Sequence, residues 1–168
     1  HQVIEISAAA AEALDFPGNC FYLDDMQYIA YRTFQISRQK GRMSMHTNEE
    51  LIAFCQEAVR IPSYSGQEKD VAEFMKRKME EYGFDEVIID KYGSVLGTIN
   101  GKRPGKTILM DGHIDTVDVI DAPQWTHDPF GGEIADGRIY GRGTSDMKGS
   151  VTAMIAAAGD FAEECGRD

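Results

Sequence analysis

Two stretches of hydrophobic residues at helical spacing follow one another from residue 47. Thr47-Asn48-Glu49-Glu50 has the form of a capping box, in which the Thr and the second Glu satisfy free N–H groups at the start of a helix. The apolar positions after this box predict a helix that ends near Ile61-Pro62. Ser65-Gly66-Gln67-Glu68 has the same form, and the apolar stripe after it predicts a second helix that stops at Gly83.

Shorter apolar runs then indicate β-structure. Runs at 86–90, 95–99 and 107–110 are β-rich and are separated by turn residues. The Asp136-Gly137 pair between apolar flanks predicts a hairpin over 134–140. A last helix is expected from about Gly149, because apolar residues recur on one face and small residues permit close packing. The predicted order is helix, helix, three strands, hairpin and helix.

Residues 1–45 differ from the rest of the chain. An alanine-rich stretch, a Phe16-Pro17-Gly18-Asn19 break and a mixed aromatic segment precede a basic patch at 38–42, and none of them suggests a chemical role. We expect an N-terminal arm of unknown role over 1–45, either a helical arm or a segment foreign to the domain that fills 46–168. The chain opens with His1 rather than Met, which leaves its natural start open.

Charge and composition exclude several classes of function. The 17 Lys+Arg against 28 Asp+Glu give a net charge of −11, which repels polyanions and argues against a nucleic-acid partner. No apolar run approaches the roughly 18 residues that a membrane span needs. The chain has three cysteines, which lie far apart and never form a CxxC pair: Cys20, Cys55 and Cys165. We therefore expect no disulfide framework and take the cytoplasm as the default location.

A histidine and an acid follow the third predicted strand. The segment 108–117 runs from apolar residues into His113 and Asp115, whose spacing of two puts both side chains on one face of a strand. A neutral imidazole is a good zinc ligand, and a neighbouring carboxylate can fix its tautomer and orientation. The pattern therefore indicates a metal ligand and its supporting acid. The alternative is a buried histidine satisfied by a local carboxylate.

A glycine-rich loop delivers a second acid just before the last helix. Asp146, in the segment 141–149, is a candidate to bridge two cations, because two metals about 3.5–4 Å apart need an anion between them. The alternative is an Asp that caps the following helix. The loop lacks the third glycine of a dinucleotide-binding motif, and Gly149 follows Lys148 where a P-loop needs Ser or Thr. No serine or cysteine has the setting of a catalytic nucleophile.

The combination of these motifs is similar to a known family. The segments HIDTV at 113–117, Trp125 with Asp128-Pro129-Phe130, and GRIYGRGTSDMKG at 137–149 resemble the metallopeptidases and deacylases that include acetylornithine deacetylase, succinyl-diaminopimelate desuccinylase and carboxypeptidase G. The resemblance covers roughly residue 49 to the C-terminus. It implies an α/β fold in which a mixed β-sheet is flanked by helices, a zinc-exopeptidase-like catalytic domain that is incomplete here. A lid domain, inserted later in the chain, would often serve for dimerisation.

Roles for individual residues follow from the same resemblance. His113 would ligate one of two Zn²⁺ ions, for which Co²⁺ or Mn²⁺ could substitute, Asp146 would bridge both, and Asp115 would orient His113. The Asp146-Met147 peptide would be cis. The family's next motif, a Glu-Glu pair that supplies the general base and another ligand, is not matched by Glu163-Glu164, which lies in the helix directly after Asp146. His127 is expected to be a solvent-facing or wall residue.

The resemblance predicts a metal-dependent hydrolase of amide bonds in N-acyl amino acids or short peptides. Because later ligands are not found, we expect this chain alone to be inactive. A catalytically inactive binding or oligomerisation module is the alternative, and a partner chain that supplies the missing ligands is a third possibility. A homodimer is expected only for the complete protein. The acidic chain does nothing to attract a substrate carboxylate, so we expect its recognition to come from residues absent here.

Overall fold

The structure is a computed structural model that describes residues 2–7, 47–101, 107–120 and 122–164. It contains helices and short strands in the predicted order, with one additional strand near the N-terminus. Two of the three cysteines, Cys20 and Cys165, lie outside the described residues, and Cys55 is buried with a free thiol. None of the helices in the described ranges is long and apolar enough to cross a membrane.

Three helices carry most of the buried hydrophobic residues of the described chain. Helix α2 spans Asn48–Arg60, α3 spans Lys69–Glu81 and α4 spans Gly149–Glu164. The predicted box at the start of α2 is confirmed, because the Glu50 N–H donates to Thr47 Oγ1 at 3.2 Å and the Thr47 N–H to Glu50 Oε2 at 2.7 Å. The second predicted box is wrong. Glu68 takes the N-cap position of α3 without a side-chain capping bond, and the hydroxyl of Ser65 is used elsewhere.

Four strands form one sheet in the order β2-β3-β1-β4. Strands β2 (Glu86–Ile89), β3 (Val95–Ile99) and β4 (Thr107–Gly112) lie where the sequence predicts them. The additional strand, β1 (Gln2–Ser7), pairs in parallel with β3 and antiparallel with β4. The expectation of a helical arm is therefore wrong for residues 2–7, and the remainder of that segment lies outside the described residues. The boundary at residue 45 stays a prediction.

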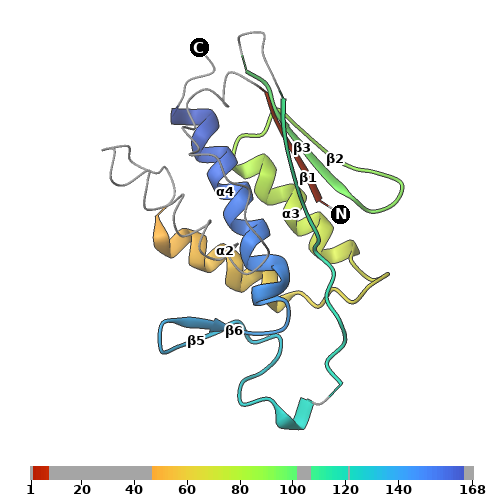
Figure 1. Cartoon of the computed structure of the whole chain (residues 1–168), viewed down its shortest axis with the longest axis vertical. Coiled ribbons are helices and arrows are strands. Elements are labelled where there is room, and N and C mark those ends of the chain that lie inside the picture. Colours follow the sequence, from red (N-terminus) through yellow and green to blue (C-terminus); the bar gives the residue numbers. More distant parts are fainter. Residues whose placement is uncertain (1, 8–46, 102–106, 121, 165–168) are drawn as a thin grey trace, which may run out of the picture.

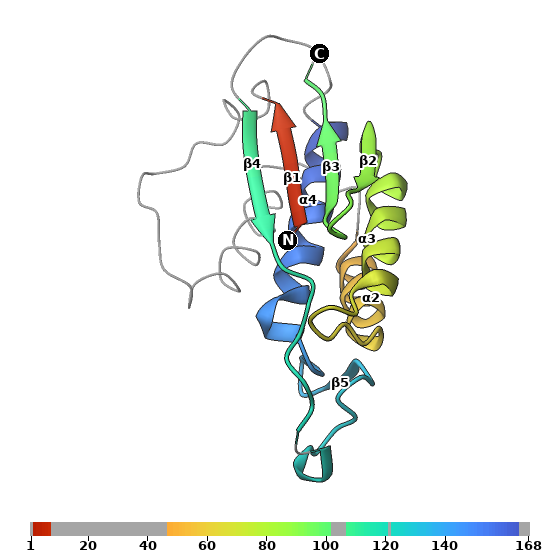
Figure 2. The same ribbon diagram turned by 90° about the vertical axis from the view of Figure 1, so that its right-hand side faces the viewer.

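The helices lie together on one side of this sheet (Figures 1 and 2). Strand β4 shows the resulting alternation, because Ile108 and Met110 pack against the core while Leu109 is 64% exposed. The core joins all three helices to β2 and β3, and its largest fully buried apolar members are Phe54, Met75, Met79, Ile155, Val59, Val71, Val95 and Val151. The sheet and helices thus form an α/β unit with a mixed sheet.

The predicted hairpin is confirmed and lies beyond the end of the sheet, near the start of α4 (Figure 1). Strand β5 (Glu133–Ala135) pairs antiparallel with β6 (Arg138–Tyr140). Asp136 and Gly137 both have positive φ, at 49° and 71°, as a two-residue type I′ turn requires. Helix α2 holds the chain before the hairpin, because Gln56 Nε2 donates to the Gly132 carbonyl at 2.6 Å.

A buried lysine connects α2 to the start of α4. Lys148 is fully buried, and its Nζ donates to the Ala58 carbonyl at 3.0 Å and to the Ile61 carbonyl at 2.6 Å. These carbonyls lie at the C-terminal end of α2, where backbone donors are scarce, and the Ala58 carbonyl also accepts the Ile61 N–H at 3.3 Å. Burial lowers the pKa of Lys148 to about 8. Lys148 therefore donates hydrogen bonds to carbonyls at the end of α2 and holds the start of α4 in place.

Replacing Gly97 with Ala should destabilise the fold. A Cβ atom at this position in β3 would lie 2.7 Å from Met79 Sδ and 2.7 Å from Phe84 Cδ1, so the core would have to shift. We expect the free energy of unfolding to fall by about 1–3 kcal/mol. Urea denaturation measures it, with Leu109→Ala on the exposed side of the sheet as a control that should change stability by less than about 0.5 kcal/mol. Equal effects of the two substitutions would contradict this packing.

Replacing Lys148 with Met should remove the Nζ donor from both carbonyls and leave Ala58 with the Ile61 N–H alone. We expect the free energy of unfolding to fall by about 2 kcal/mol near pH 7. The deficit should then depend on pH. The folded pKa of about 8 lies below the unfolded value of 10.5, so between these values the unfolded wild type binds the proton that the folded state has released. The free energy of unfolding of the wild type, relative to that of Lys148→Met, should therefore rise by about 1.4 kcal/mol per pH unit between pH 8 and 10. A difference in the free energy of unfolding that stays constant over this range would refute the lowered pKa of Lys148 in the folded state.

Candidate metal centre

The chain that carries His113 and Asp115 continues directly from β4 and is held by the segment after α2. Ser63 Oγ donates to the Ile114 carbonyl at 2.7 Å, and the Thr116 N–H donates to the Ser63 carbonyl at 2.7 Å. Both Ser63 and Thr116 are buried. Backbone and hydroxyl hydrogen bonds thus hold the segment after α2 beside the segment after β4, and they fix the direction of the side chains between Ile114 and Thr116.

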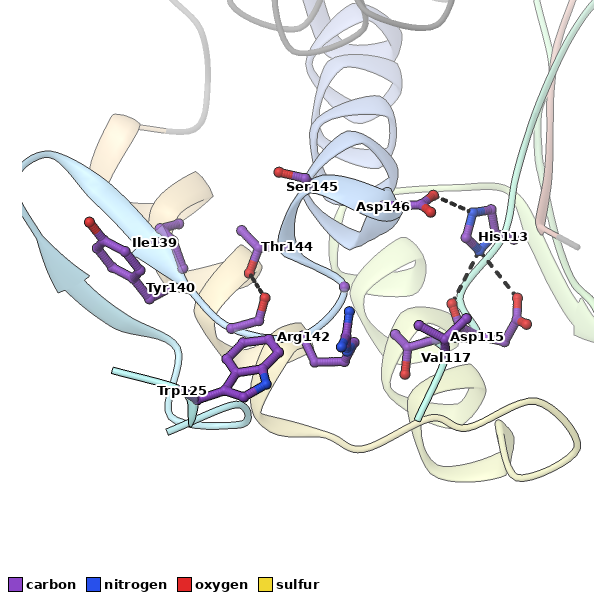
Figure 3. Close-up of a pocket in the computed structure, with 13 residues that line it drawn as sticks. His113, Asp115, Val117, Trp125, Ile139, Tyr140, Arg142, Thr144, Ser145 and Asp146 are labelled. Carbon is purple, nitrogen blue, oxygen red and sulfur yellow. Dashed lines mark hydrogen bonds and ion pairs between the residues drawn. The ribbon is translucent and has the colours of Figure 1, made fainter. Parts of the chain in front are cut away.

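Each ring nitrogen of His113 lies beside a different acidic residue. Its Nδ1 lies 3.1 Å from the Asp115 carbonyl oxygen and 3.2 Å from Asp115 Oδ1, and its Nε2 lies 2.8 Å from Asp146 Oδ1 (Figure 3). Since both neighbours of Nδ1 are acceptors, we assign a proton to Nδ1. Nε2 is then the nitrogen whose lone pair is directed at Asp146.

Ser65 supports this arrangement from the far side of Asp115. Its Oγ donates to Asp115 Oδ2 at 2.7 Å, which leaves Oδ1 for the imidazole. This hydrogen bond lowers the pKa of Asp115 below its ordinary value; partial burial opposes the shift, and the nearby His113 adds to it. Ser65, Asp115 and His113 therefore form one hydrogen-bonded chain. Sequence reasoning missed Ser65 because its capping-box pattern was given a helix-capping role.

Asp146 reaches the site from the turn Thr144–Lys148, which leads into α4. Its peptide bond to Met147 is cis, as the resemblance predicts. Gly143 begins this turn with φ of 80°, and a Cβ there would lie 2.5 Å from Thr116 Cγ2, so only glycine fits. Among the described residues, the Asp146 carboxylate makes no hydrogen bond to an N–H at the start of α4. The capping alternative is thus not what the structure shows.

The short contact between His113 and Asp146 requires a cation. An imidazole lone pair and a carboxylate oxygen at 2.8 Å are both acceptors, so a proton or a metal ion must lie between them. Partial burial disfavours an imidazolium at His113. The hydrogen bonds to Asp146 and to the Asp115 carbonyl, with the two carboxylate charges, outweigh it and raise the pKa of His113 above its ordinary value.

Other candidate ligands do not join this pair. His127 Nδ1 lies 2.9 Å from Glu133 Oε2, and its ring stacks on Tyr140 at 4.0 Å, so it is engaged within the hairpin region. Glu163 and Glu164 are in the last turn of α4, at the opposite end of the helix from Asp146. No group of three or more His, Cys, Asp or Glu side chains that could hold a metal occurs in the described ranges.

A cavity of about 360 Å³ opens beside the His113–Asp146 pair. Its walls come from the segment that follows β4, the loop at Trp125, strand β6 and the glycine-rich turn (Figure 3). Both polar and apolar side chains line it, including Arg142 beside Trp125 and the acids Asp115 and Asp146. The cavity is large enough for a small molecule placed against the two acids.

Comparison with known proteins identifies the family. A family model described as peptidase family M20/M25/M40 matches residues 109–167, which include the three predicted site residues His113, Asp115 and Asp146. The chain is 41% identical over 115 residues to a succinyl-diaminopimelate desuccinylase of Cereibacter sphaeroides (strain ATCC 17029 / ATH 2.4.9), covering 67% of this chain and 30% of that protein.

Other relatives agree. The same named enzyme of Rhodospirillum centenum (strain ATCC 51521 / SW) is 38% identical over 122 residues, covering 68% of this chain and 31% of that protein. The uncharacterized protein YgeY of Escherichia coli (strain K12) is 44% identical over 108 residues, covering 64% of this chain and 26% of its own length. The chain thus spans about 30% of the length of these curated relatives. The matches and the motif order together show that this chain belongs to peptidase family M20/M25/M40.

Proposed function

We propose that this chain forms the N-terminal part of a zinc-exopeptidase-like catalytic domain that hydrolyses amide bonds in N-acyl amino acids or short peptides with two zinc ions. The observation that carries the proposal is the convergence of His113 Nε2 and Asp146 Oδ1 at 2.8 Å, from segments 33 residues apart. The cavity beside them provides room for a substrate. The names of the desuccinylase relatives support an N-acyl substrate.

The donor set fits zinc. Zn²⁺ binds neutral imidazole and carboxylate oxygens, and the partner of the other ring nitrogen typically fixes the tautomer. Here Nδ1 is held by Asp115, and Nε2 is directed at a carboxylate. The Asp146 side chain is 87% exposed, so its second oxygen is accessible to another cation. His113 would hold one ion, Asp146 would bridge both, and Co²⁺ or Mn²⁺ could replace zinc with the same donors.

Paired zinc ions, when bound, polarise a carbonyl and lower the pKa of bound water toward neutrality. The chain's own residues do the positioning. Asp115 and Ser65 keep the His113 ring in one orientation, and Lys148 keeps the turn that bears Asp146 against the end of α2. We propose that the general base and the remaining ligands come from residues outside the described part of the chain, because three protein ligands per catalytic zinc are typical.

A catalytically inactive binding or oligomerisation module is the second candidate. The described ranges contain no group of three potential ligands, which favours this alternative if the site does not take up metal. The two candidates differ in zinc stoichiometry, which atomic absorption of the purified chain measures.

Zinc binding should depend on the convergent pair. We expect His113→Ala and Asp146→Ala each to weaken zinc affinity at least tenfold, because each removes one of the two groups that face the shared cation position. Isothermal titration calorimetry measures the affinity. His127→Ala is the matched control and should bind as the wild type does, since His127 is paired with Glu133. Unchanged affinity in the first two variants would defeat the assignment of ligands.

Asp115 should act through His113. Asp115→Ala removes the carboxylate, which is one of the two acceptors that face Nδ1, and keeps the backbone carbonyl; zinc affinity should fall about 10–100-fold. Ser65→Ala removes only the hydrogen bond to Asp115 Oδ2, so a smaller loss is expected. The same calorimetric titration checks both, with circular dichroism to confirm the fold. A loss from Ser65→Ala that exceeds the loss from Asp115→Ala would contradict the order of this chain of contacts.

A further inference from the structure

Arg142 places a positive charge in the wall of the cavity. It is the only Lys or Arg among the cavity's lining residues, which also include the acids Asp115 and Asp146. Its guanidinium carbon lies 5.0 Å from the centroid of the Trp125 ring (Figure 3). The cation–π contact holds the guanidinium beside the ring in the wall of the cavity.

The guanidinium has an unsatisfied donor. Arg142 Nε is buried and has no hydrogen-bond partner, and no carboxylate in the described part of the chain forms an ion pair with Arg142. A buried donor without a partner is costly, and it indicates that another group completes the site. The backbone fixes the position, because the Arg142 N–H donates to the Pro129 carbonyl at 2.7 Å and Gly143 follows with a φ of 80°.

The chemistry of this group selects a carboxylate. A guanidinium presents parallel N–H donors that match the two oxygens of a carboxylate, and the charge strengthens both hydrogen bonds. The rest of the chain works in the opposite direction, because its net charge of −11 and the two acids in the cavity repel anions. An anionic ligand would therefore enter this cavity only at Arg142.

We infer that Arg142, stacked on Trp125, is the specificity-determining residue that binds a carboxylate of the substrate. The inference rests on the proposed function, since it places the substrate's amide bond toward His113 and Asp146 while the carboxylate is on Arg142. It also replaces the expectation that carboxylate recognition lies wholly in residues absent here. The carboxylate belongs either to the amino acid or to a dicarboxylic acyl group, and both have the same chemistry at Arg142.

Trp125 is the only tryptophan of the chain, so its fluorescence reports directly on this site. We would titrate the full chain, in the presence of a chelator, with three probes: N-acetylalanine, N-succinylalaninamide and N-acetylalaninamide. The first has its carboxylate on the amino acid, the second on the acyl group, and the third has none. A saturable change with at least one carboxylate probe and none with the neutral amide is expected, and the responding probe identifies the source of the carboxylate.

Arg142→Gln should weaken the responding probe at least tenfold, as expected for the loss of a charged bidentate contact, whereas Arg142→Lys should recover part of the affinity. Arg138→Gln is the control, because it removes the same charge from an exposed position on β6 outside the cavity. The absence of any saturable response, or equal affinity in wild type and Arg142→Gln, would overturn the inference. Because the chelator removes zinc from the measurement, failure here is separate from failure of the zinc site.

Discussion

The ammonium group of Lys148 connects the two parts of the chain that the site depends on. Its hydrogen bonds to the Ala58 and Ile61 carbonyls satisfy the end of α2 and hold the first residue before α4 in the core. Asp146 is only two residues away, in a turn with extended backbone angles that regular helix packing would not fix. A buried charge is costly, as the lowered pKa of Lys148 indicates, and here hydrogen bonds to two carbonyl acceptors offset part of that cost.

A second set of contacts fixes the other half of the site. The segment after α2 runs beside the residues that follow β4. Ser63 is hydrogen-bonded to Ile114 and Thr116, and Ser65 to Asp115. Helix α2 therefore controls both halves, because its end receives Lys148 and the residues that follow it hold the His113 segment. The imidazole and the carboxylate meet because each is attached to the same helix end.

Local patterns predicted most of this architecture, and long-range pairing explains what they missed. The box at Thr47, the Asp136-Gly137 turn and the strands β2 and β3 depend on neighbouring residues, and they form as predicted. Strand β1 depends on partners about 90 and 110 residues away, which no local pattern contains. Ser65 has a capping pattern, yet its hydroxyl bonds to Asp115 across the fold.

The same distinction between local patterns and long-range contacts applies to the site. His113, Asp115 and Asp146 could be selected from the sequence because their residue types and motif order are characteristic, although each alone had a structural alternative. Arg142 could not, because its importance arises from a buried Nε and a tryptophan 17 residues earlier in the chain. Contacts across the fold, rather than composition, give this arginine its role in an otherwise acidic cavity.

The most direct measurement of the central claim is a crystal structure of the chain grown with zinc, with data collected on both sides of the zinc absorption edge. The account predicts an anomalous difference peak between His113 Nε2 and the Asp146 carboxylate, at about 2.0–2.2 Å from each. A peak only at His127 and Glu133, or no peak while His113 and Asp146 remain in direct contact, would contradict it.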